Sequence, residues 1–327
     1  MTAIALDIPL ISIIVPCYNA AGTLPATVQS ALAQTYPRIE IILVDDGSTD
    51  DTSAVMAALA AQDDRITVLS QENAGVAAAR NLGIAAARGE FIATLDADDL
   101  WAPEKLEAQM RCFSDPDVGV VYTWFEHIDE NDRVFSGGFH FEFSGDVFEQ
   151  LCAIDFIGNG SNALTRAHLM RDVGGYDTAL RARGAEGCED WKIALLLAER
   201  TRFAVVPRAL LGYRLTWNNM SSQFRKFTRS AEIVIDEFSA RHPKVAPILE
   251  RHQIHREVHA LIRSTLRGHF GDALWLLRRW PDYGFARPFW VLVKIIVTTG
   301  IKALGRAPSK VMHGGLRAGR VKFLGGA

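Results

Sequence analysis

Two stretches with the same layout decide the fold: ISIIVPCYN at residues 11–19 and IEIILVDDGSTDD at residues 39–51. Each begins as an apolar run rich in β-branched residues and ends in a polar turn. Strands that are apolar almost throughout are typical of a sheet that is covered on both faces. We therefore expect two buried strands, each followed by polar side chains where the chain leaves the sheet.

Strands and helices alternate through the first 125 residues. Further strands are expected at 66–69, 91–95 and 118–122, and Ala-rich helices at 21–35, 51–62, 74–88 and 103–112. Repeated β-α-β units with short links predict a parallel sheet with right-handed crossovers. The predicted fold class is α/β, with a mostly parallel, Rossmann-like central sheet flanked by helices.

The second half of the chain is less regular. Helices are expected near 146–153, 166–172 and 189–200, and strands near 202–206 and 210–214. From about Phe224 the chain becomes helical and Arg-rich, with one helix expected at 273–280. These patterns predict a helical C-terminal extension.

Composition excludes several classes of protein. The chain has 327 residues, of which 49% are hydrophobic and 22% charged, so it is neither a disordered tail nor a collagen. The four cysteines are far apart and include no C-x-x-C pair, which favours reduced thiols in the cytoplasm over a disulfide framework. Residues 1–9 lack the basic and apolar regions of a signal peptide, which agrees with a cytoplasmic protein.

Positive charge is concentrated at the C-terminus. Residues 283–327 contain eight Lys and Arg and no Asp or Glu. Residues 1–282 contain 27 Lys and Arg against 38 Asp and Glu, a net charge of −11. A basic end on an acidic body predicts an anionic partner, either a membrane face or nucleic acid. No aromatic interleaving or known motif supports nucleic acid, so an anionic membrane surface is the favoured partner of 283–327.

The segment Phe289–Ile301 is apolar except for Lys294 and two threonines. On a helix, Arg287, Lys294, Thr298 and Lys302 would form one narrow polar stripe. Such a helix would be roughly 24 Å long, too short for a hydrocarbon core. The pattern favours a helix at the membrane interface, peripheral on the inner face of the cell membrane. A helix that packs on the protein itself is the alternative.

Carboxylates cluster where two of the predicted strands end. Asp45–Asp51 contains four aspartates, and Asp96–Ala97–Asp98–Asp99 follows the strand at 91–95. Ligands bind at the carboxyl ends of strands in open parallel sheets. Clustered like charges repel, and Asp-x-Asp supplies oxygen ligands that suit Mg²⁺ or Mn²⁺. Asp96 and Asp98 are therefore the candidate metal and nucleotide site.

Helix capping is the alternative explanation for these aspartates. Asp98 or Asp99 could begin a helix near Trp101–Pro103, and Ser48, Thr49 or Asp50 could cap the helix at 51–62. Capping accounts for one aspartate in each cluster and leaves the others unexplained.

Two nucleotide-binding classes lack their phosphate-binding loops here. Residues 16–19 contain no glycine, so there is no dinucleotide fingerprint after the first strand. The chain has no G-x-x-x-x-G-K-[ST] loop either. Dehydrogenases and phosphate-loop ATPases are therefore excluded.

Four motifs occur in order at natural spacing, at residues 12–19, 44–50, 73–81 and 95–99. Together they resemble the family 2 inverting glycosyltransferases of bacterial type, which have a GT-A fold. The resemblance covers roughly residues 9–225. It implies a GT-A domain at 1–224, with a nucleotide-binding half at 9–125 and an acceptor half at 126–224. The helical, basic region at 225–327 falls outside it.

The resemblance assigns roles in donor binding. Pro16 and Tyr18 would line the nucleobase pocket, and Asp46 would hydrogen-bond the base. Arg80 would lie near the base or phosphate, Asp96 would face the ribose or sugar, and Asp98 would hold the metal. Two neighbours join this donor site: Asn19 and Asp45.

The second half resembles the family at two further motifs. Glu189–Asp190–Trp191 matches a Glu-Asp-Trp motif whose aspartate acts as general base, which implies Asp190 as the base and Glu189 as its rival. Helix capping is the alternative for Asp190. Residues 174–177 resemble a turn below the acceptor site, although a plain turn would explain them equally well. The implied acceptor-side residues are Gly175, Tyr176 and Trp191.

One motif departs from the family pattern. Many relatives carry Tyr-Arg-x-His, whereas this chain has Thr216 in place of the histidine. Thr216 is a poor substitute for an imidazole ligand, so the metal would have fewer protein ligands. Alternatively, Asn218 or Ser221 could reach the phosphates.

The resemblance implies a metal-dependent inverting glycosyltransferase with Mg²⁺ or Mn²⁺. Its donor would be a nucleotide-diphospho-sugar, with UDP as the expected nucleotide. Its acceptor would be a glycan or lipid-linked molecule. Two other classes stay open at this point: a sugar nucleotidyltransferase, and a degenerate module that binds nucleotide-sugars without catalysis.

Overall fold

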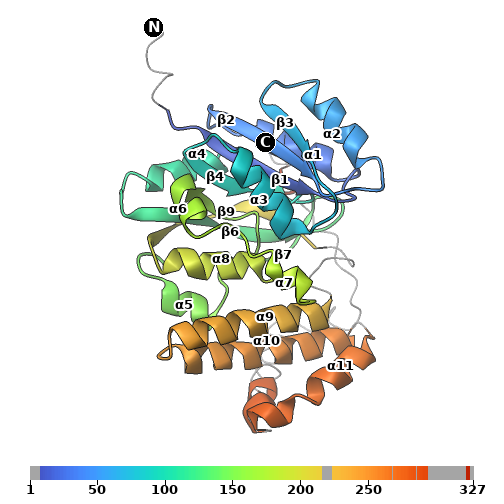
Figure 1. The fold of residues 1–327 in the computed structure, drawn as a ribbon, viewed down its shortest axis with the longest axis vertical. Helices are drawn as coiled ribbons and strands as arrows, with labels where there is room; N and C mark the ends of the chain where they lie inside the picture. Colours follow the sequence, from blue (N-terminus) through green and yellow to red (C-terminus); the bar gives the residue numbers. More distant parts are fainter. Residues whose placement is uncertain (1–7, 216–222, 267, 285, 294–321, 325–327) are drawn as a thin grey trace, which may run out of the picture.

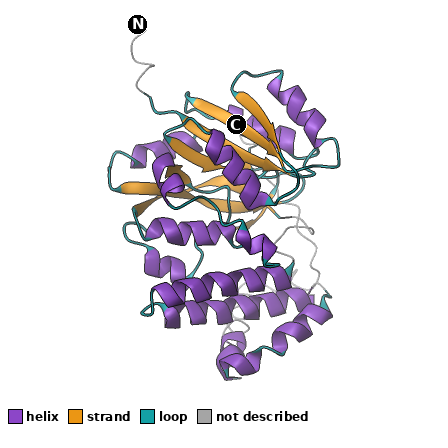
Figure 2. Cartoon of the chain, in the orientation of Figure 1, coloured by secondary structure: helices purple, strands orange, loops and turns teal. Residues whose placement is uncertain are grey.

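The computed structural model describes residues 8–215, residues 223–293 except 267 and 285, and residues 322–324. Its central layer is a nine-stranded sheet with the order β3-β2-β1-β4-β8-β6-β9-β5, to which β7 is added at β6. Helices lie on both faces of this sheet, and the C-terminal helices stack below it (Figures 1 and 2). The strands are β1 Ile11–Cys17, β2 Ile39–Asp45, β3 Ile66–Ser70, β4 Phe91–Thr94, β5 Leu100–Trp101, β6 Val118–Ile128, β7 Val134–Gly137, β8 Leu164–Arg166 and β9 Arg202–Arg214.

The helices follow the same chain order. They are α1 Leu24–Leu32, α2 Thr52–Ala60, α3 Val76–Ala86, α4 Lys105–Cys112, α5 Phe148–Ala153, α6 Ala167–Asp172, α7 Ala179–Ala182, α8 Glu189–Ala198, α9 Phe224–Arg241, α10 Ala246–Leu266 and α11 Phe270–Leu277, with a 3-10 turn at Trp280–Tyr283.

The predicted α/β class and its parallel sheet are confirmed. β1 pairs in parallel with both β2 and β4, and β2 pairs in parallel with β3. All seven residues of β1 and of β2 are buried, because alternate side chains enter the cores on the two faces of the sheet. β8, β5 and β7 each pair antiparallel with their neighbours, so the parallel pattern is mixed in the second half.

The two strands expected at 202–206 and 210–214 are one strand, β9. Its pairing with β6 moves from Val206 opposite Thr123 to Ala209 opposite Trp124. Pro207 lies in the skipped part, where a residue without a backbone N–H cannot continue the ladder. A bulge therefore replaces the predicted break, and β9 continues to Arg214.

The helix expected to begin near residues 101–103 begins later. Leu100 and Trp101 form the short strand β5 against β9, and α4 starts at Lys105 with Glu104 as its N-cap residue. Asp98 and Asp99 are therefore not the caps of this helix, and the capping explanation is wrong for both of them.

The C-terminal helices divide between two cores. The cluster that contains Val234 and Phe238 of α9 and Leu249 of α10 also contains side chains from one face of the sheet. The second half of α10 and α11 share a smaller cluster of their own, which includes Val258 and Leu276. The division of the chain at residue 224 stays a prediction.

Some predictions concern residues outside the described part of the chain. Thr216, Asn218 and Ser221 are among them, and so are Lys294, Thr298 and Lys302 of the predicted interface helix. Within the described residues, none of the helices combines the length and the apolar character that crossing a bilayer requires.

Candidate active site

An open cleft of about 1610 Å³ lies where β1 and β4 end. Segments far apart in the sequence meet there: the turns after β1 and β4, the loop before β8, the start of α8, the end of β9 and the first turn of α9. The polar and aromatic side chains that line it are Tyr18, Asn19, Thr23, Arg80, Asp96, Asp98, Asp155, Asn159, Glu189, Asp190, Tyr213 and Phe227.

Most of the predicted site residues meet in this cleft. Those that line it are Pro16, Tyr18, Asn19, Arg80, Asp96, Asp98, Glu189 and Asp190. Those that do not line it are Asp45, Asp46, Gly175, Tyr176 and Trp191.

The turn after β1 presents an aromatic ring at the cleft. Tyr18 is 53% exposed, and the next residue, Asn19, has a left-handed backbone with φ of 51°. Asn19 is held by the turn after β2: its Oδ1 accepts from the Thr49 N–H at 2.8 Å, and its own N–H donates to Ser48 Oγ at 3.1 Å. These bonds fix the turn, so the exposed ring of Tyr18 is a stable surface for a flat group such as a nucleobase.

Asp45 and Asp46 direct their carboxylates into the protein. The two oxygens of Asp46 accept from the backbone N–H groups of Ala74 and Gly75, at 2.8 and 2.9 Å, at the start of α3. A carboxylate at a helix N-terminus satisfies N–H groups that have no partner within the helix. Asp45 likewise accepts from the N–H of Ser48 at 2.9 Å. Contact between these two residues and a base stays a prediction.

Arg80 is a buried cation at the edge of the cleft. Its Nη2 donates to Asp96 Oδ1 at 2.5 Å, and its guanidinium lies 5.0 Å from the centre of the Tyr176 ring. Burial lowers the pKa of Arg80, but Asp96, Tyr176 and Asp190 more than offset this and raise it. Arg80 is therefore permanently charged, and the charges of both Asp96 and Asp190 act on it.

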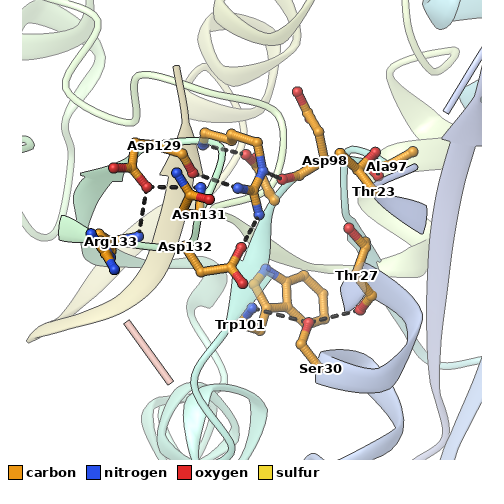
Figure 3. Close-up of polar contacts among 12 residues, drawn as sticks. Thr23, Thr27, Ser30, Ala97, Asp98, Trp101, Asp129, Asn131, Asp132 and Arg133 are labelled. Atoms are coloured by element: carbon orange, nitrogen blue, oxygen red, sulfur yellow. Dashed lines mark hydrogen bonds and ion pairs between the residues drawn. The ribbon is translucent and has the colours of Figure 1, made fainter. Parts of the chain in front are cut away.

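Arg214 holds the turn that carries Asp98. Its Nε donates to the backbone oxygen of Asp98 at 2.6 Å, and its other guanidinium nitrogens donate to the backbone oxygen of Asp129 and to Asp132 Oδ1. Figure 3 shows Asp98, Asp129 and Asp132 gathered at this turn. Thr23 Oγ1 donates to the oxygen of Ala97 at 2.8 Å from the α1 side (Figure 3).

Asp99 has a structural role in the same turn. It is fully buried and accepts from the N–H of Arg214 at 2.8 Å and from Ser161 Oγ at 2.5 Å. Because Asp99 is engaged in this way, Asp96 and Asp98 are left to line the cleft.

The cleft is short of positive charge. Asp96, Asp98, Asp155, Glu189 and Asp190 line it, whereas Arg80 is the one Lys or Arg among its described lining residues. Burial and the neighbouring Asp96 raise the pKa of Asp98 to about 6, although Arg214 opposes this. Burial raises the pKa of Glu189 and Asp190 as well. A bound cation would relieve this repulsion.

The residues present fit a hard divalent cation with few protein ligands. The Asp98 carboxylate accepts no hydrogen bond within the described part of the chain, and Asp96 is bonded through one oxygen to Arg80. Across the described residues, however, no three His, Cys, Asp or Glu side chains come together as a metal cage. Such a cation would take its remaining ligands from the donor phosphates and water.

The predicted acceptor-side residues do not line the cleft, and two of them are buried in the protein. Tyr176 is buried, and its backbone N–H and oxygen each pair with the Asn81 amide at 2.8 Å. Gly175 has φ of +72°, and a Cβ there would lie 2.4 Å from Asn81 Oδ1. Trp191 is 1% exposed and donates its Nε1–H to the oxygen of Leu151 at 2.9 Å. Their contact with an acceptor stays a prediction.

Asp190 lies within the first turn of α8, since Cys188 is the N-cap residue. Asp190 is therefore not the N-cap residue itself, but a structural role at this helix end stays open beside the role of base. One of its oxygens accepts from the Trp191 N–H at 2.8 Å. Glu189 accepts from the N–H of Gly187 at 2.8 Å.

Sequence analysis missed Asp155 and Phe227. Asp155 accepts from the N–H of Gly158 at 3.1 Å, and burial together with the nearby charge of Asp190 raises its pKa to about 7. In the sequence it is a single aspartate between Ile154 and Phe156, with no motif around it. Phe227 comes from α9, in the region that the family resemblance does not cover.

A sheet that is parallel in its first half, with an acidic cleft at its strand ends, is the arrangement expected of a glycosyltransferase with a GT-A fold. The model of glycosyl transferase family 2 matches residues 12–173. One relative is TuaG of Bacillus subtilis, which is named as a putative teichuronic acid biosynthesis glycosyltransferase. It is 30% identical over 72% of this chain and 90% of its own length. The chain belongs to glycosyl transferase family 2 and is a glycosyltransferase.

Other relatives match over shorter segments. The glycosyltransferase GlyG of Streptococcus pneumoniae is 43% identical over 42% of this chain and 45% of its own length. WfgD of Escherichia coli, named as a UDP-Glc:α-D-GlcNAc-diphosphoundecaprenol β-1,3-glucosyltransferase, is 41% identical over 39% of this chain and 51% of its own length. The chain thus spans less than half the length of GlyG. Family membership favours glycosyl transfer over the sugar nucleotidyltransferase and the non-catalytic module.

Solved structures share the fold at low sequence identity. TarS 1–349 of S. aureus in complex with UDP-GlcNAc has a TM-score of 0.60 at 17% identity, over 89% of this chain and 92% of that one. The mannosyltransferase PcManGT of Pyrobaculum calidifontis, in complex with GDP-Man and Mn²⁺, has a TM-score of 0.56 at 22% identity, over 91% and 88%.

Proposed function

We propose that this enzyme transfers a sugar from a UDP-linked donor to a glycan or lipid-linked acceptor, by one displacement that inverts the anomeric carbon. The observation that carries the proposal is the meeting of Tyr18, Asp98 and Asp190 in one cleft. The exposed ring of Tyr18 suits the base, the turn with Asp98 suits the diphosphate, and Asp190 suits the acceptor hydroxyl.

A UDP-sugar is the donor that the relatives favour. WfgD is named for UDP-Glc, and TarS was solved with UDP-GlcNAc. PcManGT was solved with GDP-Man, so the identity of the base is the first part of this assignment to test. WfgD is also named for a lipid-diphosphate-linked acceptor, which supports an acceptor of that class.

Asp98, with Asp96 beside it, would hold Mg²⁺ or Mn²⁺, which when bound neutralises the charge on the departing diphosphate. The acidic lining supports this, because a diphosphate would otherwise face five carboxyl groups and one arginine. Arg214 keeps Asp98 in place through the backbone of its turn.

Asp190 would act as the general base. Burial raises its pKa, and the neighbouring Arg80 opposes this. The acceptor hydroxyl would give its proton to this carboxylate as the new bond to the anomeric carbon forms and the bond to the diphosphate oxygen breaks. Glu189 is the rival candidate; each of the two carboxylates accepts one backbone N–H, so substitution of each in turn distinguishes them.

We extend the proposal to the organisation of the chain and its place in the cell. Residues 1–224 would form the catalytic domain, and 225–327 would serve to bring it to a membrane that carries a lipid-linked acceptor. The Lys and Arg of 283–327 support this, because anionic headgroups attract such segments.

The role of Asp190 can be tested by separating donor binding from turnover. UDP release would be followed with UDP-sugars and lipid-diphosphate-linked or short glycan acceptors. We expect Asp190→Asn to bind UDP as the wild type does and to turn over about 100-fold more slowly or worse. Glu189→Gln should retain most of the turnover. Wild-type turnover by Asp190→Asn, or a loss confined to Glu189→Gln, would overturn the assignment.

A further inference from the structure

α11 carries a wide apolar stripe, one side of which is buried and the other exposed. Ala273 and Leu276 are buried against α10. Phe270, Leu274 and Leu277 point away from this core and are 68%, 50% and 41% exposed. An apolar stripe that the protein covers along one side only leaves its other side for a partner, because water disfavours it.

Further apolar side chains extend this exposed face. Leu266 is 82% exposed at the end of α10, and Phe289 and Trp290 are 52% and 66% exposed. Six of the ten large exposed hydrophobic side chains in the described part of the chain therefore fall between residues 266 and 290. We call these six the apolar surface: Leu266, Phe270, Leu274, Leu277, Phe289 and Trp290. Scattered exposed leucines are ordinary, but a concentration of this kind marks an interaction surface.

Basic residues outnumber acidic ones in this stretch of sequence: residues 266–290 contain four Arg, against Asp272 and Asp282. Arg278, next to Leu277, is exposed and has no partner among the described residues. Asp272 of α11 is neutralised by Arg225, whose Nε lies 2.7 Å from Asp272 Oδ1. Beyond residue 282 the sequence contains no acidic residue. Apolar side chains bordered by Lys and Arg are the composition of helices that lie in the headgroup region of a bilayer.

The α11 part of the apolar surface begins at the end of α9 that borders the cleft, whereas Trp290 lies against the first half of α10. The start of α11 contacts the start of α9 through the Arg225–Asp272 pair and through the rings of Phe224 and His269, 6.1 Å apart. Phe227, one turn further along α9, lines the cleft. In Figure 1 α11 begins beside the same end of α9. The part of the apolar surface around Phe270 is therefore next to the helix that contributes Phe227 to the cleft.

We propose that the apolar surface docks the enzyme on a bilayer with anionic phospholipid headgroups. This inference rests on the proposed membrane association of residues 225–327 and names the surface that would make the contact, and it does not depend on glycosyl transfer. A second copy of the chain is a poorer occupant, because positive charge would face positive charge. A neutral apolar partner would leave Arg278 and the basic C-terminal sequence without a counterpart.

The experiment measures sedimentation of the full chain with vesicles of phosphatidylcholine, alone and mixed with phosphatidylglycerol. We expect binding to the mixed vesicles that falls as salt is raised, and weak binding to the neutral ones. The double variant Phe270→Ser/Leu274→Ser should lose about tenfold or more in vesicle affinity. Val68→Ser, which removes an exposed apolar side chain of β3 at the far end of the molecule, should bind as the wild type does.

Calorimetric titration with UDP keeps this test separate from the proposed function, since both variants lie outside the cleft and should bind UDP equally. The proposal is overturned if the wild type ignores mixed vesicles, or if Phe270→Ser/Leu274→Ser binds them unchanged. It is also overturned if that variant converts a wild-type dimer to a monomer while vesicle binding stays the same, because the apolar surface is then an interface between copies.

Discussion

Gly160→Ala is expected to break the link between Arg80 and Asp96. A Cβ at residue 160 would lie 2.1 Å from Arg80 Nη2, 2.8 Å from Arg80 Cζ and 3.2 Å from Asp96 Oδ2. The backbone of Gly160 does not have a positive φ, so the added methyl group acts through space and not through strain. Arg80 has nowhere to move, because it is 4% exposed and packed over the Tyr176 ring.

The cost follows from these contacts. Overpacking a buried site costs ~1–3 kcal/mol. Separating a buried ion pair costs ~3–5 kcal/mol, but Asp96 is 27% exposed and water can replace part of the lost interaction. We therefore expect the free energy of unfolding to fall by ~2–4 kcal/mol. UDP affinity in the presence of Mn²⁺ should fall about tenfold or more, since Asp96 loses its fixed position.

Urea unfolding and calorimetric titration with UDP measure the two effects. Gly22→Ala is the matched control, because a Cβ at residue 22 would have no atom within 4 Å and the backbone φ is not positive. We expect that control to stay within ~0.5 kcal/mol of the wild type. If Gly160→Ala unfolds like Gly22→Ala and binds UDP like the wild type, the reasoning about Arg80 and Asp96 is refuted.

Two further predictions concern buried charges. Because the pKa of Asp155 is raised to about 7, the folded state holds this proton more tightly than the unfolded state, and the contribution to stability is lost as pH rises from about 4 to about 7. The free energy of unfolding of Asp155→Asn should therefore exceed that of the wild type by ~1–2 kcal/mol at about pH 8 and equal it near pH 4. A difference that is the same at both pH values would contradict the assignment. Arg214→Met should lower the free energy of unfolding by ~3–5 kcal/mol and abolish Mn²⁺-dependent UDP binding, because it frees the turn of Asp98 and leaves Asp132 without its ion pair. Arg208→Met, which removes an exposed partner of Glu104, should change stability by less than ~1 kcal/mol, and equal losses in the two variants would show that Arg214 has no special role.

The parallel half of the fold could be predicted because its signal is local. Apolar runs such as 11–15 and 39–44 are buried on both faces wherever they pair, so burial and strand formation agree. β9 was predicted as two strands because its pattern breaks around Pro207, and the bulge that preserves the ladder depends on its partner, β6. The short strand β5 also exists only because β9 pairs with it.

The candidate site could be predicted where carboxylates cluster in the sequence. Asp96, Asp98 and Asp190 line the cleft as expected, whereas Asp46 is engaged by the N–H groups of Ala74 and Gly75. An Asp-Asp pair after a strand does not reveal which carboxylate turns inward. Asp155 could not be predicted, because its importance comes from burial beside Asp190, and those two residues are distant in the sequence.

The central claim is that the cleft binds a nucleoside diphosphate through a divalent cation held at Asp98. Calorimetric titration of UDP, with Mn²⁺ and with a chelator, tests it most directly in the wild type, Asp98→Asn and Asp172→Asn. Asp172 is an exposed carboxylate of α6 outside the cleft and provides the control. The account predicts Mn²⁺-dependent binding that is lost in Asp98→Asn and kept in Asp172→Asn. Binding of UDP that is equally tight in the chelator, or unchanged in Asp98→Asn, would contradict it.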